Sequence, residues 1–352
     1  MYPLFLLNSN NRQKDNYVGN RTKTAICRLF ARAHSFLLNL YDYDCTCKIV
    51  WQETLNLICR RKDELEMIVV TGANGKLGRK VVEELLKRLP AGDVGVSVRD
   101  VDKVRDLQER GVRVRQGNFE DSESLLYAFE EASQVLMISS HSLGEAAVRQ
   151  HQTAIDAAKK AGVGRLLYTS QMFSSATSHF SPMNVHAATE EMLQSSGMAF
   201  TSLRNGFYAA SAIMWMGDAL ETGELIAPED GPVAWTTHSD LAEAAAVILT
   251  EQRYDGITPP LTASEAMDMS GIASIASKAL DRPIRRIVVS DDEYRIHLVS
   301  RGLPKAMVDM LTGMFQASRL GDFSQTNPAL EHLIGRSPVN FSDFLKDSLI
   351  NA

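Results

Sequence analysis

The sequence predicts an α/β fold, with a doubly wound parallel sheet followed by a smaller, mostly helical C-terminal lobe. Three observations predict it. Short apolar, β-branched runs alternate with segments of helical periodicity from Met67 to about residue 208. Three glycines follow the first of these runs, and beyond residue 208 helix-like segments dominate. Strands that alternate with helices of this length form parallel βαβ units with right-handed crossovers.

Residues 67–208 are expected to form the sheet. Residues 67–71 are apolar and β-branched, as expected of a buried parallel strand. Further strands are expected at 94–98, 112–115, 135–138, 165–168 and 200–203. The helices between them are expected at 79–89, 101–110, 122–131, 146–161 and 186–195. This alternation predicts a Rossmann-type domain.

Residues 209–352 are expected to form the smaller substrate lobe, with some segments returning to the sheet. Glycines and prolines separate its expected helices, which are 240–250, 267–280, 292–301 and 305–318. The lobe is expected to close over the C-terminal edge of the sheet, where open α/β sheets bind their ligands.

The composition changes at Met67. All four cysteines lie before it, and residues 1–66 hold ten Lys/Arg and seven Asp/Glu. The whole chain has a net charge of −6, which leaves −9 for residues 67–352. An acidic body argues against nucleic-acid binding, and a body without cysteine suits a reducing, cytoplasmic compartment. No apolar run is long enough for a membrane span, and no metal-ligand cluster is recognised.

The segment 1–66 is expected to be an N-terminal extension outside the fold. An alternative is organelle targeting, because residues 16–41 contain four basic side chains and no acid.

The glycine triplet Gly72-x-x-Gly75-x-x-Gly78 lies between the first strand and the first helix. Gly72 permits a tight turn, Gly75 lets the main chain approach a pyrophosphate, and Gly78 lets the helix pack against the strand. The helix N-terminus offers free N–H groups to the phosphates. The alternative is an ordinary strand-to-helix turn, but the triplet, its strand, its helix and a second strand together indicate a dinucleotide site.

The end of the second strand, Arg99-Asp100, bears on the choice of cofactor. An arginine can bind the 2′-phosphate of NADP(H), whereas a carboxylate binds the ribose hydroxyls of NAD(H). We favour NADP(H), and NAD(H) stays open because Asp100 is adjacent. Asn118-Phe119 and Ser139–Ser142 follow the third and fourth strands, where they could flank the adenine and the middle of the cofactor, or serve only as loops.

The fuller pattern resembles a known family. The segments TGANGKLG, SVRD, GNFED, MISSHS, YTS, HAATEEML, SLRNGFY and AWTTHSDLAEAAAVIL are similar to those of the NmrA-like branch of the atypical short-chain dehydrogenase/reductases. Within that branch, the chain most resembles the type-2 NAD(P)H:quinone oxidoreductases. The resemblance covers residues 67–352 and leaves out residues 1–66.

The resemblance implies an NADPH-binding domain that reduces quinones by two electrons. It places cofactor contacts in the glycine loop, at the basic 2′-phosphate position and in the segments after later strands. The residues so implied are Gly72, Ala73, Asn74, Gly75, Lys76, Leu77, Arg99, Ser140, His141, Ser142, Arg204, Asn205, Gly206, Phe207, Tyr208 and Thr237. We add, as expected contacts from the same motifs, Gly78, Asn118, Phe119, Ser139, Tyr168, Thr169 and Ser170. His141 and Phe207 depart from the family's usual serine and tryptophan.

Catalysis cannot use the Tyr-x-x-x-Lys pair of the wider superfamily, because no tyrosine here precedes a lysine by four residues. The candidates are His186, Tyr208 and Asn205. His186 could instead be a helix-start residue that points to solvent. An apolar wall beside the nicotinamide is expected from Met172, Phe173, Phe207, Met214, Trp215 and Met216, unless these residues belong to the core.

Three functions remain open at this point. The first is an NADPH-dependent reductase of quinones or similar apolar, conjugated carbonyl acceptors. The second is a non-catalytic NADP(H)-binding redox sensor that regulates a partner protein, and the third is a reductase for one specialised metabolite. A homodimer is a possible assembly.

Overall fold

The computed structural model describes residues 67–251 and 254–350. These residues belong to one compact unit, Glu66–Ala352. The segment 1–66, with its alternative interpretations as an extension or a targeting segment, lies outside the described residues.

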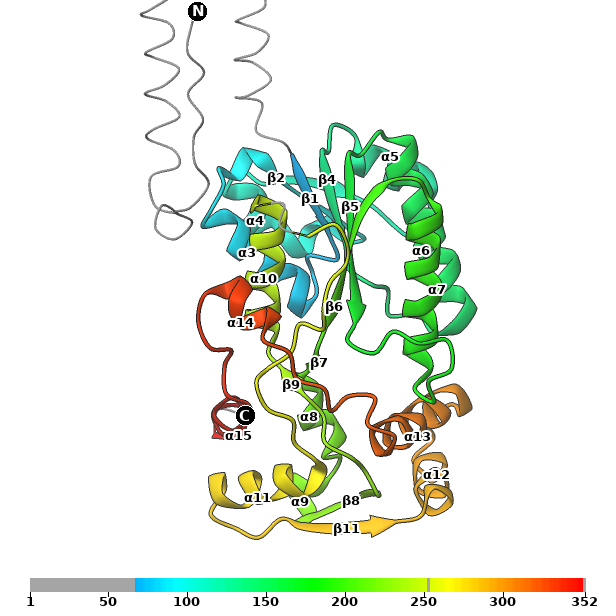
Figure 1. Ribbon diagram of the computed structural model, residues 1–352, viewed down its shortest axis with the longest axis vertical. Helices are drawn as coiled ribbons and strands as arrows, with labels where there is room; N and C mark the ends of the chain where they lie inside the picture. The colour runs from blue at the N-terminus through cyan, green and yellow to red at the C-terminus, as the bar shows by residue number, and fades with distance from the viewer. Residues whose placement is uncertain (1–66, 252–253, 351–352) are drawn as a thin grey trace, which may run out of the picture. The chain divides into compact units, whose positions relative to one another are not determined.

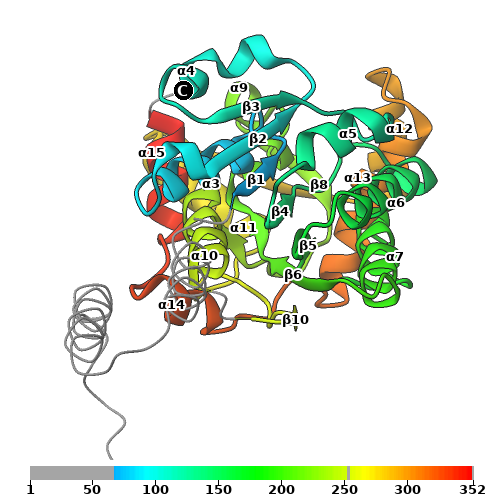
Figure 2. The ribbon, with the colours of Figure 1, turned by 90° about the horizontal axis from the view of Figure 1, so that it is seen from above.

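A seven-stranded sheet forms the centre of this unit (Figures 1 and 2). The strands run in the order β10-β6-β5-β4-β1-β2-β3, and all their pairings are parallel. Their bounds are β1 (Ile68–Thr71), β2 (Val94–Val98), β3 (Arg113–Gln116), β4 (Gln134–Met137), β5 (Arg165–Gln171), β6 (Ala199–Asn205) and β10 (Gly256–Ile257). After β3 the chain returns to place β4 on the other side of β1, which makes β1 and β4 the switch point where such sheets bind ligands. The predicted fold class is confirmed.

Alternate side chains of the strands fill two separate cores. Val70 and Leu167 belong to one core, and their neighbours Val69 and Leu166 belong to the other. Successive side chains of a strand point to opposite faces of the sheet, so the apolar runs are buried on both sides.

Helices cover both faces (Figures 1 and 2). One face carries α3 (Lys76–Leu86), α10 (His238–Glu251) and α14 (Ala329–Ile334), and the other carries α5 (Ser122–Phe129), α6 (Gly144–Lys160) and α7 (Ser181–Ser195). In α3, the buried residues Val81, Val82 and Leu85 form one apolar stripe toward the sheet.

Two predicted helices differ in extent. The segment expected as one helix at 101–110 is a 3₁₀ turn, η2 (Val101–Val104), followed by α4 (Arg105–Glu109), because the backbone of Val104 (φ −130°, ψ 24°) interrupts the helix. Helix α7 begins at Ser181, five residues before the expected start, because Pro182 is tolerated in a first turn. His186 is therefore in the second turn of α7 and not at its start.

The C-terminal lobe has its own core, which includes Trp235, Phe315 and Phe323. Helices α11 (Met269–Ala279), α12 (Asp291–Ser300) and α13 (Lys305–Arg319) lie where helices were expected. The unexpected helices beyond residue 208 are α8 (Ala209–Trp215), α9 (Ala219–Thr222), α15 (Phe341–Ile350) and the α14 described above. The unexpected strand pairs are β8 (Glu224–Pro228) with β11 (Arg285–Val289), and β7 (Phe207–Tyr208) with β9 (Trp235–Thr236).

Three segments beyond residue 208 lie in the layers of the sheet, namely α10, α14 and β10. Helix α10 packs against α3, and β10 extends the sheet beyond β6. The proposed boundary between residues 208 and 209 stays a prediction.

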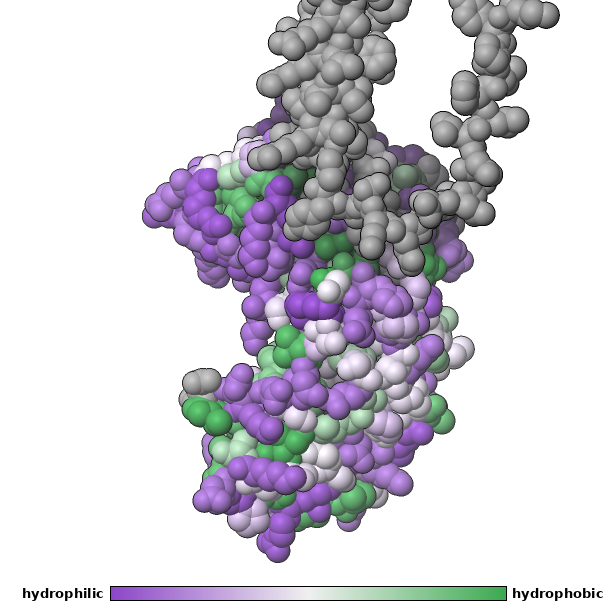
Figure 3. Space-filling model, turned by 60° about the vertical axis from the view of Figure 1, so that its left-hand side comes forward, coloured by the Kyte–Doolittle hydropathy of each residue, from purple (hydrophilic) through white to green (hydrophobic). Residues whose placement is uncertain are grey.

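The surface over α3 and α10 is mostly polar and charged, with apolar side chains in small separate patches (Figure 3). Among the described residues, exposed large apolar side chains are spread over several elements, for example Tyr127 on α5 and Ile296 on α12. No helix in residues 67–251 and 254–350 combines the length and the apolar character that a bilayer crossing requires.

Candidate functional site at the C-terminal edge of the sheet

The glycine loop between β1 and α3 is shaped for close approach. Gly72 has φ +64°, a conformation that favours glycine. A Cβ at Gly78 would lie 2.5 Å from the carbonyl oxygen of Gly72, so the helix can pack on the loop only with glycine there. Gly75 is the N-cap of α3 and supplies no side-chain cap, and the first turn holds no acid. The first N–H groups of α3 therefore face outward without a side-chain partner, as an anion site requires.

The other loop residues divide into buried and exposed. Ala73 and Leu77 are buried beneath the loop, whereas Asn74 and Lys76 are exposed. Asn74 Nδ2 donates to the carbonyl oxygen of Asp100 (3.1 Å), which ties the glycine loop to the end of β2.

Arg99 is an exposed cation at the end of β2. Its guanidinium forms no ion pair within the described residues. The carboxylate of Asp100 accepts from the N–H of Asp102 (3.1 Å) and lies 3.4 Å from Lys103 Nζ. Because Asp100 is already engaged, this edge is better suited to a phosphate at Arg99 than to ribose hydroxyls at Asp100.

The loop after β3 is held by its own side chains. Asn118 Oδ1 accepts from the N–H of Glu120 (3.1 Å), and the N–H of Asn118 donates to Ser124 Oγ (3.0 Å). The ring of Phe119 packs edge-on against His151, with 6.4 Å between ring centroids. Contact of Asn118 and Phe119 with adenine stays a prediction.

The loop after β4 is fastened through main-chain N–H groups. The N–H of Ser139 donates to Thr169 Oγ1 (2.9 Å), and the N–H of Ser140 donates to His151 Nε2 (2.9 Å). The N–H of Ser142 donates to Ser140 Oγ (3.2 Å), and His141 is exposed. We call Ser139–Ser142 the cofactor loop from here on.

A buried tyrosine and a histidine meet near this loop. Tyr168 Oη lies 2.7 Å from His186 Nδ1. Burial raises the pKa of Tyr168 well above its usual range, and burial lowers the pKa of His186 to about 4. Both groups are therefore neutral near pH 7. The structure brings these two predicted residues together although neither was predicted to contact the other.

Glu190 of α7 is the centre of a buried polar network that the sequence did not indicate. Its Oε1 accepts from Ser170 Oγ (2.8 Å), Ser202 Oγ (2.8 Å) and Arg204 Nε (3.1 Å), and its Oε2 accepts from Arg204 Nη2 (2.7 Å). Burial alone would raise the pKa of Glu190, but the bonds from Arg204 and Ser170 outweigh burial and hold it below its usual range. The side chains of Ser170 and Arg204 are thus engaged within the protein, and their contact with a cofactor stays a prediction.

Asn205 and Tyr208 form a second polar group after β6. Asn205 is 2% exposed, and its Oδ1 has no hydrogen-bond partner among the described residues. Burial raises the pKa of Tyr208, and the nearby side chain of Asn205 opposes this shift only in part. The ring of His238 lies against that of Tyr208, with 4.4 Å between centroids. A buried amide oxygen without a partner is a candidate contact for a ligand.

Three neighbouring predicted residues have structural roles. A Cβ at Gly206 would lie 2.2 Å from Thr236 Oγ1, so glycine is needed there. Phe207 packs on Trp235 in the core of the lobe. Thr237 is buried, and its hydroxyl donates to Asp240 Oδ2 (2.7 Å) at the start of α10.

Most of the residues expected to form the apolar wall belong to the hydrophobic core. Met172, Phe207, Trp215 and Met216 are buried in the core of the lobe. Only Phe173 and Met214 are exposed, at 40% and 61%. For these four residues the alternative holds, and they belong to the core. Trp215 is buried because α8 turns that side toward the core of the lobe.

His151, Thr189, Glu190 and His238 were missed. His151 did leave a signal, since it shares the apolar face of its helix with Ala147 and Ala154. A histidine at such a position needs a buried hydrogen-bond partner. No comparable pattern marks Glu190, whose partners come from two strands.

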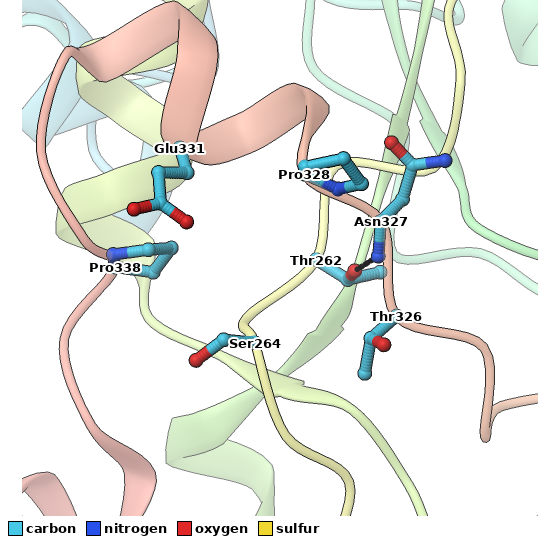
Figure 4. Close-up of a pocket in the computed structure, with 7 residues that line it drawn as sticks. All are labelled: Thr262, Ser264, Thr326, Asn327, Pro328, Glu331 and Pro338. Atoms are coloured by element: carbon cyan, nitrogen blue, oxygen red, sulfur yellow. Dashed lines mark hydrogen bonds between the residues drawn. The ribbon is translucent and has the colours of Figure 1, made fainter.

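A pocket of about 200 Å³ lies elsewhere (Figure 4). Its lining consists of Thr262, Ser264, Thr326, Asn327, Pro328, Glu331 and Pro338. The N–H of Asn327 donates to Thr262 Oγ1 (2.8 Å) across it. None of the predicted cofactor or catalytic residues lines this pocket. The described residues also contain no group of three or more His, Cys, Asp or Glu that could hold a metal ion.

Comparisons with known proteins agree with this geometry. The model of the NmrA-like family matches residues 64–344. Quinone oxidoreductase 2 of Escherichia coli (strain K12) is 34% identical over 278 residues, which cover 79% of this chain and 96% of that protein.

Solved structures that are similar to the chain include two reductases crystallised with their cofactor. The NADPH-dependent quinone oxidoreductase of Escherichia coli complexed with NADPH has a TM-score of 0.76 at 32% identity, covering 80% of this chain and 99% of that one. The triphenylmethane reductase of Citrobacter sp. complexed with NADP(H) has a TM-score of 0.74 at 32% identity, covering 80% and 100%.

Proposed function

The chain belongs to the NmrA-like family, and on that premise we propose that this NAD(P)H-dependent oxidoreductase transfers hydride from NADPH to a quinone or a similar conjugated carbonyl acceptor. Similar proteins are named a quinone oxidoreductase and a triphenylmethane reductase, and both names describe acceptors built on conjugated rings. The observation that carries the proposal is the Tyr168–His186 pair, because it fixes a neutral imidazole at the C-terminal edge of the sheet.

The residues present fit NADPH. The glycine loop offers main-chain N–H groups, and the close contact that Gly78 permits leaves no room for a side chain. Arg99 would bind the 2′-phosphate through charge-assisted hydrogen bonds, and the cofactor loop would support the middle of the dinucleotide.

Reduction of a quinone to a hydroquinone takes one hydride and one proton. NADPH supplies the hydride when it is bound. The chain's own side chains have to orient the acceptor and to stabilise the negative charge that grows on its oxygen.

His186 is suited to that second task as a hydrogen-bond donor. The phenol of Tyr168 is the stronger acid of the pair and the imidazole nitrogen is the stronger base, so Tyr168 donates to His186 Nδ1. This bond leaves the imidazole proton on Nε2, where it can donate to an acceptor oxygen. With a pKa of about 4, His186 stays neutral near pH 7, and the proton that completes the hydroquinone comes from solvent.

Asn205 and Tyr208 would orient the ligands beside His186. The unpartnered amide oxygen of Asn205 can accept a hydrogen bond from an amide or hydroxyl group. Burial raises the pKa of Tyr208, which keeps its hydroxyl protonated. Tyr208 is thus a second potential donor beside Asn205.

The test is NADPH oxidation with a panel of quinones. We expect turnover with at least one quinone, and a kcat roughly 100-fold lower for His186→Phe, since loss of one charge-stabilising donor costs about that factor. Tyr168→Phe should lower kcat less, because it frees the imidazole to change tautomer without removing it.

His179→Phe is the matched control, because His179 is exposed and lies just before α7. It should leave kcat unchanged. Tight NADPH binding without turnover of any acceptor would contradict the proposal and would favour the non-catalytic, NADP(H)-binding regulator.

A further inference from the structure

His151 is a buried histidine near the middle of α6. It is 1% exposed, and its ring lies between the rings of Phe119 and Tyr168, with 6.4 and 5.3 Å between centroids. Both its nitrogens are bonded, to the N–H of Ser140 and to Thr189 Oγ1. The side chain thus connects the cofactor loop, β5 and α7.

The partners of His151 allow only one neutral tautomer. The N–H of Ser140 can only donate, so His151 Nε2 must be an unprotonated acceptor (2.9 Å). The imidazole proton is therefore on Nδ1, and it is donated to Thr189 Oγ1 (2.8 Å). A cationic His151 would carry a second proton on Nε2 and would lose the bond from Ser140. Burial, and then the proximity of His186, lower the pKa of His151 to about 3, in agreement with a neutral ring.

Thr189 carries the link into α7. Its Oγ1 donates to the carbonyl oxygen of Val185 (2.8 Å), one turn earlier in α7. The ring of Tyr168 packs edge-on against that of His151, and the hydroxyl of Tyr168 contacts His186 Nδ1 (2.7 Å). His151 is therefore joined to the cofactor loop and to α7 by hydrogen bonds, and to the partner of His186 by ring packing.

We propose that His151 is a positioning residue of the reductase, which holds the cofactor loop, Tyr168 and α7 in one arrangement and thereby sets the distance between the bound cofactor and His186. The inference rests on the proposed function. His151 does not touch cofactor or acceptor itself. It acts because neither the loop nor α7 can shift without breaking a buried bond, and an unpaired buried group is costly.

Two substitutions of His151 each keep one of its two hydrogen bonds and remove the other. In His151→Gln, the amide oxygen can take the place of Nε2 and still accept from Ser140. In His151→Asn, the shorter amide can take the place of Nδ1 and still donate to Thr189. Thr189→Val removes the α7 half without changing the shape of the side chain. His297→Gln is the control, because His297 is exposed on α12.

We expect His151→Asn to lower kcat roughly ten- to hundredfold, because a misplacement on the order of 1 Å can cost about that factor. His151→Asn should also weaken NADPH binding, because it releases the cofactor loop. Thr189→Val should lower kcat with NADPH affinity unchanged, because it loosens only α7. His151→Gln should bind NADPH with the affinity of the wild type, but its kcat should stay low as in His151→Asn. A uniform loss of folded protein could not lower kcat and leave the NADPH affinity unchanged. Wild-type values of kcat and KM in His151→Asn and Thr189→Val would overturn the proposal.

Nitrogen-15 NMR of the histidines tests the hydrogen bonds of His151 and does not require turnover. In the wild-type full chain, His151 should be neutral with its proton on Nδ1 at pH 6, and a proton on Nε2 would overturn the proposal. If no acceptor is turned over, the proposed function fails, while the tautomer and the NADPH affinities of the variants still decide the role of His151.

Discussion

At the end of β2, Arg99 and Asp100 lie near the surface, and the carboxylate of Asp100 contacts groups only two or three positions away, such as Lys103. At the ends of β5 and β6 the polar side chains are buried, and their partners come from distant elements. We call these the adenosine end and the nicotinamide end of the proposed cofactor site.

Because of this difference, the adenosine end should contribute to cofactor affinity, and the nicotinamide end should fix the positions of the reacting groups. Exposed charges at the adenosine end can adapt to a phosphate, and each contributes modest free energy because water screens it. Buried bonds at the nicotinamide end are hard to rearrange, so they can hold reacting groups at fixed distances. Changes at the two ends should therefore affect different measurements.

The largest effect is expected at the loop that serves both ends. In Gly78→Ala, the new Cβ would lie 2.5 Å from the carbonyl oxygen of Gly72, and the loop must move. Overpacking of this kind costs about 3 kcal/mol, or about a hundredfold in affinity. Calorimetric titration should show the loss equally for NADPH and NADH. Gly92→Ala is the control, since nothing lies within 4 Å of the added Cβ. An unchanged affinity in Gly78→Ala would contradict the close approach.

The next effect is on stability and compares the two ends directly. Glu190→Gln leaves the guanidinium of Arg204 without its buried partner, so the free energy of unfolding should fall by about 3 kcal/mol. Asp102→Asn breaks the exposed pair with Arg105 at the adenosine end and should cost less than about 1 kcal/mol.

Urea unfolding of both variants measures this contrast, with Glu191→Gln as a control because Glu191 is the exposed neighbour in α7. Equal losses for Glu190→Gln and Asp102→Asn would remove the distinction between the two ends.

Stability should fall as the pH is lowered through the histidine range. Burial lowers the pKa values of His151 to about 3 and of His186 and His238 to about 4, below the ordinary 6.5. Below pH 6.5 the unfolded chain binds these protons and the folded chain does not. Each of these histidines then costs about 2 kcal/mol of stability between pH 6.5 and 5.

Unfolding titrations at several pH values check this. His151→Gln should reduce the loss between pH 6.5 and 5 by about 2 kcal/mol, the share of one histidine. A free energy of unfolding that does not change over this range would show that the three imidazoles are not held neutral.

The smallest effect is expected at Arg99. Arg99→Ala should weaken NADPH binding by about 1.5 kcal/mol, roughly tenfold, and leave NADH binding unchanged, because only NADPH carries the 2′-phosphate. Arg105→Ala, at an exposed arginine nearby that pairs with Asp102, should change neither affinity. If Arg99→Ala lowered kcat without weakening NADPH binding, Arg99 would act at the nicotinamide end and not at the adenosine end.

Several parts of the site could be predicted because their signals are local. The strands of the sheet appear as apolar runs, and Gly72, Gly75 and Gly78 lie between a strand and a helix at the spacing that a phosphate loop needs. The resemblance to the NmrA-like family is confirmed by the match over residues 64–344. The nine residues expected as apolar wall or catalytic groups could not be sorted in the same way, because the burial of Trp215, for example, depends on how α8 packs in the lobe.

By itself, the sequence determined the alternation of strands and helices from β1 to β6, the glycine turn and the position of Arg99. All three follow from spacing, turn chemistry or charge within a few residues. Only the tertiary structure decided that His151 binds Ser140 and Thr189, that Tyr168 binds His186, and that Glu190 binds Arg204. The reason is that these bonds join α6, α7 and neighbouring strands, and their partners meet only when the helices pack on the face of the sheet.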